Sequence, residues 1–176
     1  MHAKLETKRL LLRQLEITDW ELIKFLRTDP QVNEFVDRPG ADSKEAALAF
    51  INKINEGIAN NQYCYWAICS LSDNETMIGS VCLWNFNETR TQAEIGFDLH
   101  PQYQGKGIMT EAVGEVLSYG FIDLGLDRID AYTHHANVKS LNLLKRFNFV
   151  YQPEMKDSYN ENNIVYILSS QEFKKR

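Results

Sequence analysis

The sequence predicts an α+β fold in which about seven strands and about four helices follow one another along the chain. Two stretches carry this prediction. Residues 92–99 alternate between apolar and polar side chains, which is typical of a half-buried strand. The apolar residues between Thr110 and Leu124 recur at helical spacing instead. No repeat, low-complexity tract or linker divides the chain, so we expect a single domain over residues 1–176.

The first third of the chain predicts one strand and two helices. Residues 8–15 form a short apolar run with polar flanks, as an opening strand would. Thr18 is expected to cap a first helix, which ends at Pro30. Ser43 is expected to cap a second helix that continues to about Ile58. The two helices therefore come before the main sheet.

The middle of the chain predicts a hairpin and a third strand. Residues 62–71 and 77–86 are rich in aromatic and β-branched side chains and are joined by turn-forming residues 72–75. The strand 92–99 follows and closes at Pro101. Its alternation puts one set of side chains on an apolar face and another on a polar face: Ala93, Ile95, Phe97 and Leu99 against Glu94, Gly96 and Asp98.

The stretch from Gln102 to Gly107 leads directly into the helix that we expect to start near Thr110. Two glycines, Gly105 and Gly107, let backbone N–H groups approach a ligand, and the first helical turn adds further unpaired donors. This arrangement suits a phosphate or pyrophosphate. The loop fits neither the P-loop nor the dinucleotide-binding glycine pattern. A surface turn between a strand and a helix is the alternative.

The last third of the chain predicts a strand, a helix and two strands. Residues 127–133 read as a strand, and Asn137 is expected to start a helix that stops at Asn148. Residues 149–151 and 164–168 supply the last two strands. The complete order is strand, two helices, three strands, helix, strand, helix and two strands.

Composition narrows the classes of function. The length of 176 residues and a hydrophobic content of 44% suit one packed domain. Nineteen basic and 24 acidic residues give a net charge of −5, which argues against a nucleic-acid or anionic-membrane binder. A basic partner is mildly favoured. The chain contains neither a signal-like apolar segment nor a run long enough to span a membrane, so we expect a cytoplasmic protein.

The cysteines and the paired histidines indicate no metal site. Cys64, Cys69 and Cys82 are odd in number, lack metal-ligand spacing and lie in apolar stretches, so we expect buried reduced thiols. His134 and His135 are adjacent, and adjacent side chains on a strand point to opposite faces.

The chain resembles the GCN5-related N-acetyltransferase (GNAT) superfamily over nearly its whole length, and within it the RimJ/RimL type that acetylates ribosomal-protein N-termini. The matching segments are residues 93–97, Gln102-x-x-Gly105-x-Gly107, residues 110–112 and Asn137-x-x-Ser140. The resemblance implies the GNAT fold, a mixed and mostly antiparallel sheet that splays in the middle and carries helices on its faces. It also implies an enzyme, an acetyl-CoA-dependent N-acetyltransferase.

The resemblance implies where acetyl-CoA, the donor, would bind. Its pyrophosphate would contact the backbone amides of Gln104, Gly105, Lys106, Gly107, Ile108, Met109 and Thr110. Its pantetheine arm would lie beside Phe97 and Leu99 like an additional strand. Asn137 is both a coenzyme A contact in the family and a plausible N-cap. The Thr110 hydroxyl and the Lys106 ammonium could pair with phosphate, or serve as a helix cap and a solvated loop lysine.

Acetyl transfer to an amine needs a base, stabilisation of the thioester oxygen and a proton for the leaving thiolate, but no covalent enzyme intermediate. Glu94 is the candidate base, directly or through a water, and Asp98 competes for that role. Ser140 resembles the family's proton donor to the sulfur, although a serine at a helix start can be only a cap. Many family members use a tyrosine seven residues after the asparagine, where this chain has Leu144.

The acceptor is the least defined part of the sequence. The resemblance favours the α-amine of a protein or peptide N-terminus. A small amine, such as a polyamine or an aminoglycoside-like antibiotic, is the alternative, and a coenzyme A-binding module without turnover is a third hypothesis. We expect the first two helices and the turns at residues 84–90 and 156–163 to select the acceptor. The resemblance also implies a possible homodimer.

Overall fold

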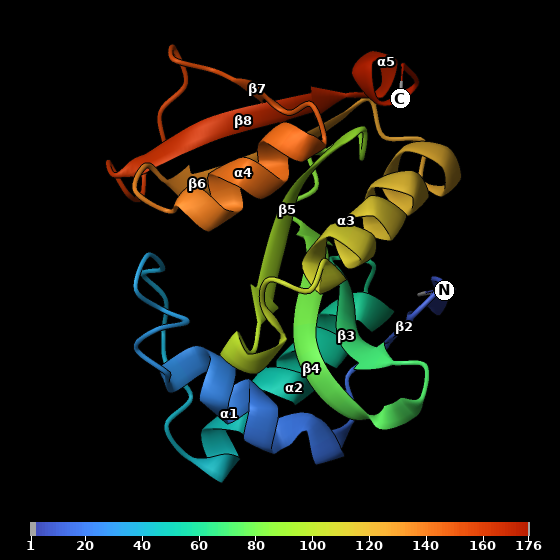
Figure 1. Cartoon of the computed structure of the whole chain (residues 1–176), viewed down its shortest axis with the longest axis vertical. Helices are drawn as coiled ribbons and strands as arrows, with labels where there is room; N and C mark the ends of the chain where they lie inside the picture. Colours follow the sequence, from blue (N-terminus) through green and yellow to red (C-terminus); the bar gives the residue numbers. More distant parts are fainter. Residues whose placement is uncertain (1–2, 176) are drawn as a thin grey trace.

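The computed structural model describes residues 3–175, apart from the side chains of residues 74 and 75. Its described part contains one sheet of eight strands in the order β1-β2-β3-β4-β5-β6-β8-β7 (Figure 1). The strands are β1 (Leu5–Glu6), β2 (Leu10–Arg13), β3 (Cys64–Ser70), β4 (Asp73–Trp84), β5 (Gln92–Leu99), β6 (Arg128–His134), β7 (Val150–Tyr151) and β8 (Asn163–Ser169). Every neighbouring pair is antiparallel except β5 and β6, which confirms the predicted mixed, mostly antiparallel α+β sheet.

Five α-helices accompany the sheet in the described residues: α1 (Trp20–Thr28), α2 (Lys44–Ala59), α3 (Ile108–Ser118), α4 (Val138–Arg146) and α5 (Ser170–Phe173). The prediction missed the two-residue strand β1 and the four-residue helix α5, because elements this short show no hydrophobic period. Helix α3 begins at Ile108, two residues earlier than expected, and continues as a π-helical turn over Tyr119–Asp123.

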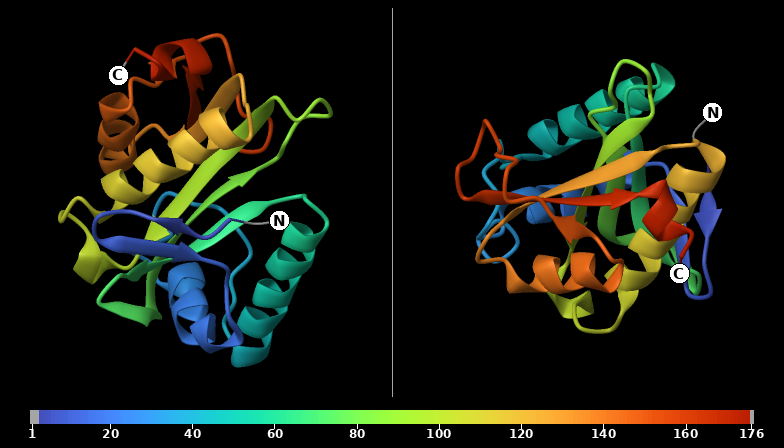
Figure 2. Two further views of the ribbon diagram at one scale, coloured as in Figure 1. Left: turned by 90° about the vertical axis from the view of Figure 1, so that its right-hand side faces the viewer. Right: turned by 90° about the horizontal axis from the view of Figure 1, so that it is seen from above.

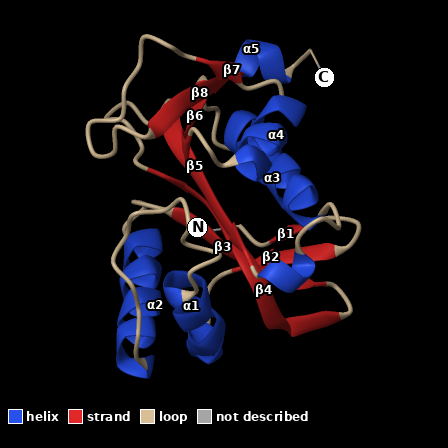
Figure 3. Cartoon of the chain, turned by 60° about the vertical axis from the view of Figure 1, so that its left-hand side comes forward, coloured by secondary structure: helices blue, strands red, loops and turns tan. Residues whose placement is uncertain are grey.

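Helices cover both faces of the sheet. Figure 2 shows α1 and α2 on one side of the strands and α3 on the other, and Figure 3 shows the same two layers. Alternate residues of each strand face the two layers, so that Leu12 and Trp66 join the core beneath α3 whereas Leu11 and Ala67 join the core beneath α1 and α2. Both cores are built from fully or nearly fully buried side chains.

The sheet splays between β5 and β6, as the resemblance implied. These strands pair only from Gln92 opposite Arg128 to Glu94 opposite Asp130. Beyond this point β5 continues along β4 to Leu99, whereas β6 continues along β8 to His134. Figure 1 shows the two strands diverging, with β5 leading toward α1 and β6 lying under α4. One edge of β5 is therefore left without a strand partner.

The helix boundaries confirm the predicted cap at Ser43 and the predicted stop at Asn148, and they correct the predicted cap at Thr18. The Ser43 hydroxyl accepts a hydrogen bond from the amide of Ala46, and Asn148 ends α4 with a positive φ of 62°. Thr18 does not cap α1. It lies in a short 3₁₀ turn, where Asp19 accepts a hydrogen bond from the amide of Glu16 instead.

Asp19 also forms a buried ion pair with Arg13. Both guanidinium nitrogens of Arg13 donate to the Asp19 carboxylate, each at 2.8 Å, and this pair joins β2 to the start of α1. The carboxylate is only 4% exposed at the residue level, so water cannot replace it.

Replacing Asp19 by alanine is therefore expected to lower the free energy of unfolding by about 3–5 kcal/mol, because the buried Arg13 guanidinium loses its carboxylate. Urea unfolding followed by circular dichroism measures this loss. The matched control is Glu21→Ala, which removes an exposed carboxylate two residues further along and should cost less than about 1 kcal/mol. A similar, small loss for both variants would contradict the structural role of the pair.

Candidate active site

The loop before α3 has the geometry of an anion cradle. Gly105 and Gly107 have positive φ angles of 75° and 73°, and no atom outside the neighbouring residues lies within 4 Å of the position of a Cβ on Gly105. Gly107 is the N-cap of α3, so the amides of the following first turn have no acceptor within the helix. Backbone donors and the positive end of the helix dipole thus converge on open space, which fits a phosphate group.

Two residues that the sequence did not point to hold this loop in place. Arg9, at the start of β2, pairs with Glu111 in the first turn of α3 at 2.6 Å and donates to the carbonyl of Lys106 at 3.1 Å. Thr7 donates to the same Glu111 carboxylate at 2.6 Å. Burial of Glu111 raises its pKa, but the hydrogen bonds from Thr7 and Arg9 outweigh this effect and leave the pKa below its ordinary value.

The free edge of β5 leads to this loop. The amide of His100 donates to the carbonyl of Ile78 on β4. Successive residues of a strand direct their backbone groups to opposite edges. The backbone groups of Phe97 and Leu99 therefore point away from β4, toward the free edge. That edge faces the splay. The Gln104 side-chain amide donates to the Leu99 carbonyl at 3.2 Å. The Gln104 backbone amide was predicted to face the anion, but here it donates to the Pro101 carbonyl at 3.1 Å.

A cavity of about 990 Å³ occupies the space where the sheet splays. Among the predicted site residues, Glu94, Phe97, Asn137 and Ser140 line it, together with the competing base Asp98. Leu99 and residues 104–110 lie outside this lining and form the separate loop region described above. The cavity is also lined by residues of the turns that were expected to select the acceptor: Trp84, Asn85, Lys156, Asp157, Ser158, Tyr159, Asn160 and Asn163.

Glu94 lies at the last residue pair that joins β5 to β6, where the cavity begins. Burial raises the pKa of its carboxyl group, and the negative charges of Asp130 and Asp157 raise it further. The side-chain amide of Asn85 donates to the carboxylate and opposes this shift. A carboxylate with a raised pKa is a better proton acceptor at neutral pH than a solvated one. No pattern in the sequence pointed to Asn85 as the hydrogen-bond partner of Glu94.

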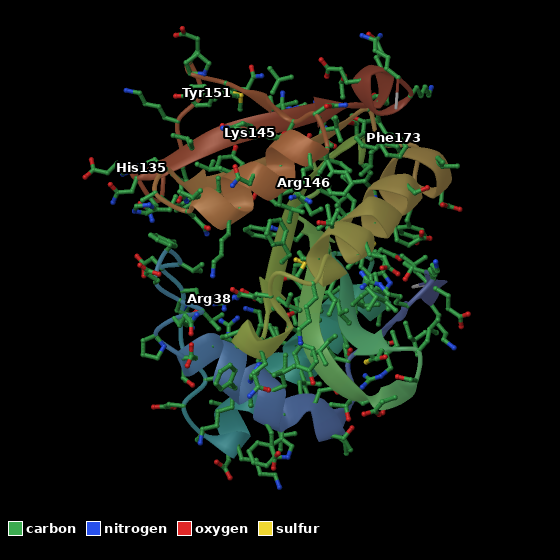
Figure 4. The ribbon with its side chains drawn as sticks, viewed as in Figure 1. Arg38, His135, Lys145, Arg146, Tyr151 and Phe173 are labelled. Atoms are coloured by element: carbon green, nitrogen blue, oxygen red, sulfur yellow. The ribbon has the colours of Figure 1, made fainter. Side chains whose placement is uncertain are left out.

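Asp98 faces the same cavity but is committed to Arg38. The guanidinium donates to both carboxylate oxygens of Asp98, at 2.7 and 3.2 Å, and to the Leu26 carbonyl at 2.8 Å. Arg38 belongs to the connection between α1 and α2, and Figure 4 shows its side chain on the side of that connection that faces the sheet. Because the ion pair occupies both oxygens of Asp98, Glu94 is the more available carboxylate.

Ser140 lies in the wall of the cavity formed by α4. The N-cap of α4 is Asn137, whose side chain accepts a hydrogen bond from the Ser140 amide at 3.1 Å, so the Ser140 hydroxyl is not the cap. Ser140 is only 8% exposed, and among residues 3–175 its hydroxyl has no hydrogen-bond partner. Leu144, which replaces the tyrosine of many family members, is fully buried in the core.

The three cysteines are free thiols. Cys64 and Cys69 are buried as predicted, whereas the prediction was wrong for Cys82, which is only partly buried because it lines the cavity. Burial raises the pKa of Cys82 to about 12, and the negative charge of Asp98 adds to this effect. The group is therefore a thiol rather than a thiolate at neutral pH. The described residues hold no cluster of three or more potential metal ligands, and none of their helices is long and apolar enough to cross a bilayer.

The chain is similar in sequence to known acetyltransferases. A family described as "Acetyltransferase (GNAT) domain" matches residues 9–150. The N-acetyltransferase YnaD of Bacillus subtilis is 34% identical over 140 residues, which cover 80% of this chain and 78% of that protein. The spermidine N(1)-acetyltransferase of Escherichia coli is 30% identical over 77 residues, or 44% of this chain and 41% of that protein.

Among solved structures, the ribosomal-protein-S5-alanine acetyltransferase of Vibrio fischeri superimposes with a TM-score of 0.80 at 23% identity. The alignment covers 97% of this chain and 98% of that one, so the two proteins share the fold. The family match spans β2 to β7 and includes the glycine loop, the splayed strand β5 and the start of α4. The chain belongs to the GNAT family and is an acetyl-CoA-dependent N-acetyltransferase.

Proposed function

We propose that the protein transfers the acetyl group of acetyl-CoA to the α-amine of a peptide or protein N-terminus, by direct attack of the amine on the thioester. The observation that carries this proposal is the position of Glu94. It is a partly buried carboxylate with a raised pKa, and it lies where the free edge of β5 opens into the cavity. A proton acceptor is thus available beside the place where the donor arm would end.

The donor would use two surfaces that meet at Leu99. Its pyrophosphate would bind at the glycine loop, on backbone amides of Gly105 to Thr110, and its amide-containing arm would pair with the free edge of β5 at Phe97 and Leu99. The positive φ angles of the loop and the unpaired edge support this placement. Asn137 would contact the donor while it continues to cap α4.

The transfer needs one proton acceptor and one proton donor. Glu94 would take a proton from the acceptor ammonium, directly or through water, so that the neutral amine forms the new C–N bond. The C–S bond of the thioester would break as the attacking nitrogen loses its second proton to solvent, and the Ser140 hydroxyl would give its proton to the departing thiolate and regain one from solvent. The Ser140 hydroxyl is buried and has no hydrogen-bond partner among the described residues, which supports this role.

The charge of the cavity favours a peptide over a polyamine. Its lining contains four basic residues, Arg27, Arg38, Lys53 and Lys156, and four acidic residues, Asp37, Glu94, Asp98 and Asp157. A polyamine is cationic along its whole length and would gain most from an excess of acidic groups. A peptide N-terminus carries one amine followed by neutral amides, which suits a balanced, polar and aromatic cavity.

The two acceptor classes are separated by steady-state kinetics. With acetyl-CoA held constant, kcat/KM is measured from thiol release for a peptide with a free N-terminus, for the same peptide with a blocked N-terminus, and for spermidine. The proposal expects turnover of the free peptide at least about tenfold above the other two, a difference of about 1.4 kcal/mol in transition-state binding. Preference for spermidine, the substrate named for one relative, would overturn the peptide assignment.

Replacing Cys82 by alanine tests the direct route. Because its thiol stays protonated at neutral pH, we expect the variant to keep kcat within about threefold of the wild type. Mass spectrometry of the protein after incubation with acetyl-CoA alone provides the control and should detect no added acetyl group on any cysteine. A stable acetylated Cys82, or a large loss of kcat in the variant, would indicate a covalent intermediate instead.

A further inference from the structure

The side chain of Gln104 connects the two halves of the splayed sheet. Its amide nitrogen donates to the Leu99 carbonyl at the end of β5, at 3.2 Å, while its amide oxygen accepts from the ammonium of Lys139 on α4, at 2.7 Å. Lys139 and Gln104 are 35 residues apart in the sequence. The bridge crosses the splay beside the loop at which the donor pyrophosphate is proposed to bind.

The bond to Leu99 occupies a group that the proposed donor arm needs. The Leu99 carbonyl belongs to the free edge of β5, where an incoming amide would donate a hydrogen bond as a neighbouring strand does. The Gln104 side chain also ends in an amide N–H donor, on a primary amide where the donor arm carries secondary amides. It therefore satisfies the exposed edge in the same way that a bound pantetheine amide would.

The positive charge of Lys139 lies at the end of α4 where the helix dipole is also positive. It lies in the first turn of α4, where the helix dipole disfavours a positive charge, and that turn contains no acidic residue. Within residues 3–175, neither Lys139 nor Lys106 forms an ion pair, whereas the third nearby cation, Arg9, is paired with Glu111. On a chain with a net charge of −5, two cations without a carboxylate partner thus lie at the glycine loop, although the Lys106 ammonium also lies 5.5 Å from the centre of the Tyr103 ring. A lysine placed against the helix dipole departs from the usual preference of a helix N-terminus, and such departures are typical of functional residues.

We propose that Gln104 holds the place of the donor amide on Leu99 and that Lys139 is a phosphate-binding residue of the donor site. When acetyl-CoA binds, its arm displaces the Gln104 side chain from the Leu99 carbonyl, and the same movement frees the Lys139 ammonium to pair with a phosphate. This inference rests on the proposed donor site at β5 and the glycine loop. It adds Lys139 as a phosphate-binding residue, and it requires the hydrogen bond between Gln104 and the Leu99 carbonyl to break when the donor binds.

The test compares two donors that differ in their phosphates. Calorimetry measures the Kd of acetyl-CoA and of S-acetylpantetheine, which lacks every phosphate, for the wild type and for Lys139→Met. We expect the variant to bind acetyl-CoA about tenfold more weakly and S-acetylpantetheine equally well, because only the charge-assisted bond to phosphate is lost. Lys139→Arg should restore most of the affinity. The control is Lys145→Met, which removes an exposed charge near the other end of α4 (Figure 4) and should change neither Kd.

A second variant tests the displaced contact. Gln104→Ala removes the competing amide, so we expect S-acetylpantetheine to bind about two- to fivefold more tightly. Weaker binding by this variant would make Gln104 a permanent ligand and overturn the displacement. Equal effects of Lys139→Met on both donors, or no effect on either, would overturn the phosphate role. If the wild type itself binds no acetyl-CoA, the proposed donor site is wrong. If the wild type binds acetyl-CoA normally and the variants bind it equally well, only the roles of Lys139 and Gln104 are wrong.

Discussion

Replacing Gly107 by glutamate is expected to weaken acetyl-CoA binding by about 100-fold, or about 2.7 kcal/mol. Gly107 has a φ of 73°, a conformation that costs a residue with a side chain about 1–2 kcal/mol. The new carboxylate would also add a negative charge at the N-terminus of α3, where a phosphate is proposed to bind. Calorimetric titration with acetyl-CoA measures the change.

Two controls separate strain from charge in this experiment. Gly107→Ala keeps the strain without the charge and should weaken binding by only about tenfold or less. Gly125→Ala introduces comparable strain, at a φ of 68°, in the turn after the π-helical segment, so it should reduce stability and leave the Kd of acetyl-CoA unchanged. Wild-type affinity in a folded Gly107→Glu variant would mean that the glycine loop does not hold the donor.

Replacing Glu94 by glutamine is expected to lower kcat by about 10²–10⁴, the usual contribution of a general base, at pH values above the pKa of Glu94 and below that of the acceptor amine. The pKa of Glu94 is raised above its ordinary value, chiefly by burial, so the active carboxylate form is present above that pKa and disappears as the pH falls through it. The wild type should therefore lose activity on the acid side of its profile. The difference between the two proteins should narrow at high pH, where the acceptor amine loses its proton unaided.

Replacing either of two residues near Glu94 should shift the acid limb, the low-pH side of the pH–rate profile, and the two shifts should be in opposite directions. Asn85→Ala removes the hydrogen bond that lowers the pKa of Glu94, so the limb should shift to higher pH. Asp157→Asn removes a negative charge that raises this pKa, so the limb should shift to lower pH. A pH–rate profile that is the same in Glu94→Gln and the wild type would remove Glu94 from the mechanism.

Much of the fold could be predicted because its signals are local. The alternation of residues 92–99 identified β5 and its two faces, and Ser43 and Asn137 marked helix starts because a capping side chain bonds to an amide three residues ahead. Thr18 misled for a related reason. The next residue, Asp19, is held by its buried pair with Arg13 and accepts the hydrogen bond from the Glu16 amide, a contact that the local sequence does not show.

The parts of the site that could not be predicted depend on contacts between distant segments. Arg9 supports the glycine loop through Glu111, 102 residues later in the chain, and neither residue carries a local pattern. Arg38 pairs with Asp98 across 60 residues, and this contact makes Asp98 less available than Glu94 on the same face of β5. The role of Lys139 likewise depends on its distance from Gln104 in space rather than in sequence.

The central claim, direct acetyl transfer to an N-terminal α-amine, is tested most directly by locating the acetyl group on one substrate. The protein is incubated with acetyl-CoA and a peptide that carries both a free N-terminus and an internal lysine, and the product is sequenced by tandem mass spectrometry. We expect one acetyl group on the α-amine for each thiol released, and loss of this product in Glu94→Gln at pH values above the pKa of Glu94 and below that of the acceptor amine. Acetylation of the lysine side chain alone, or thiol release only when spermidine replaces the peptide, would contradict it.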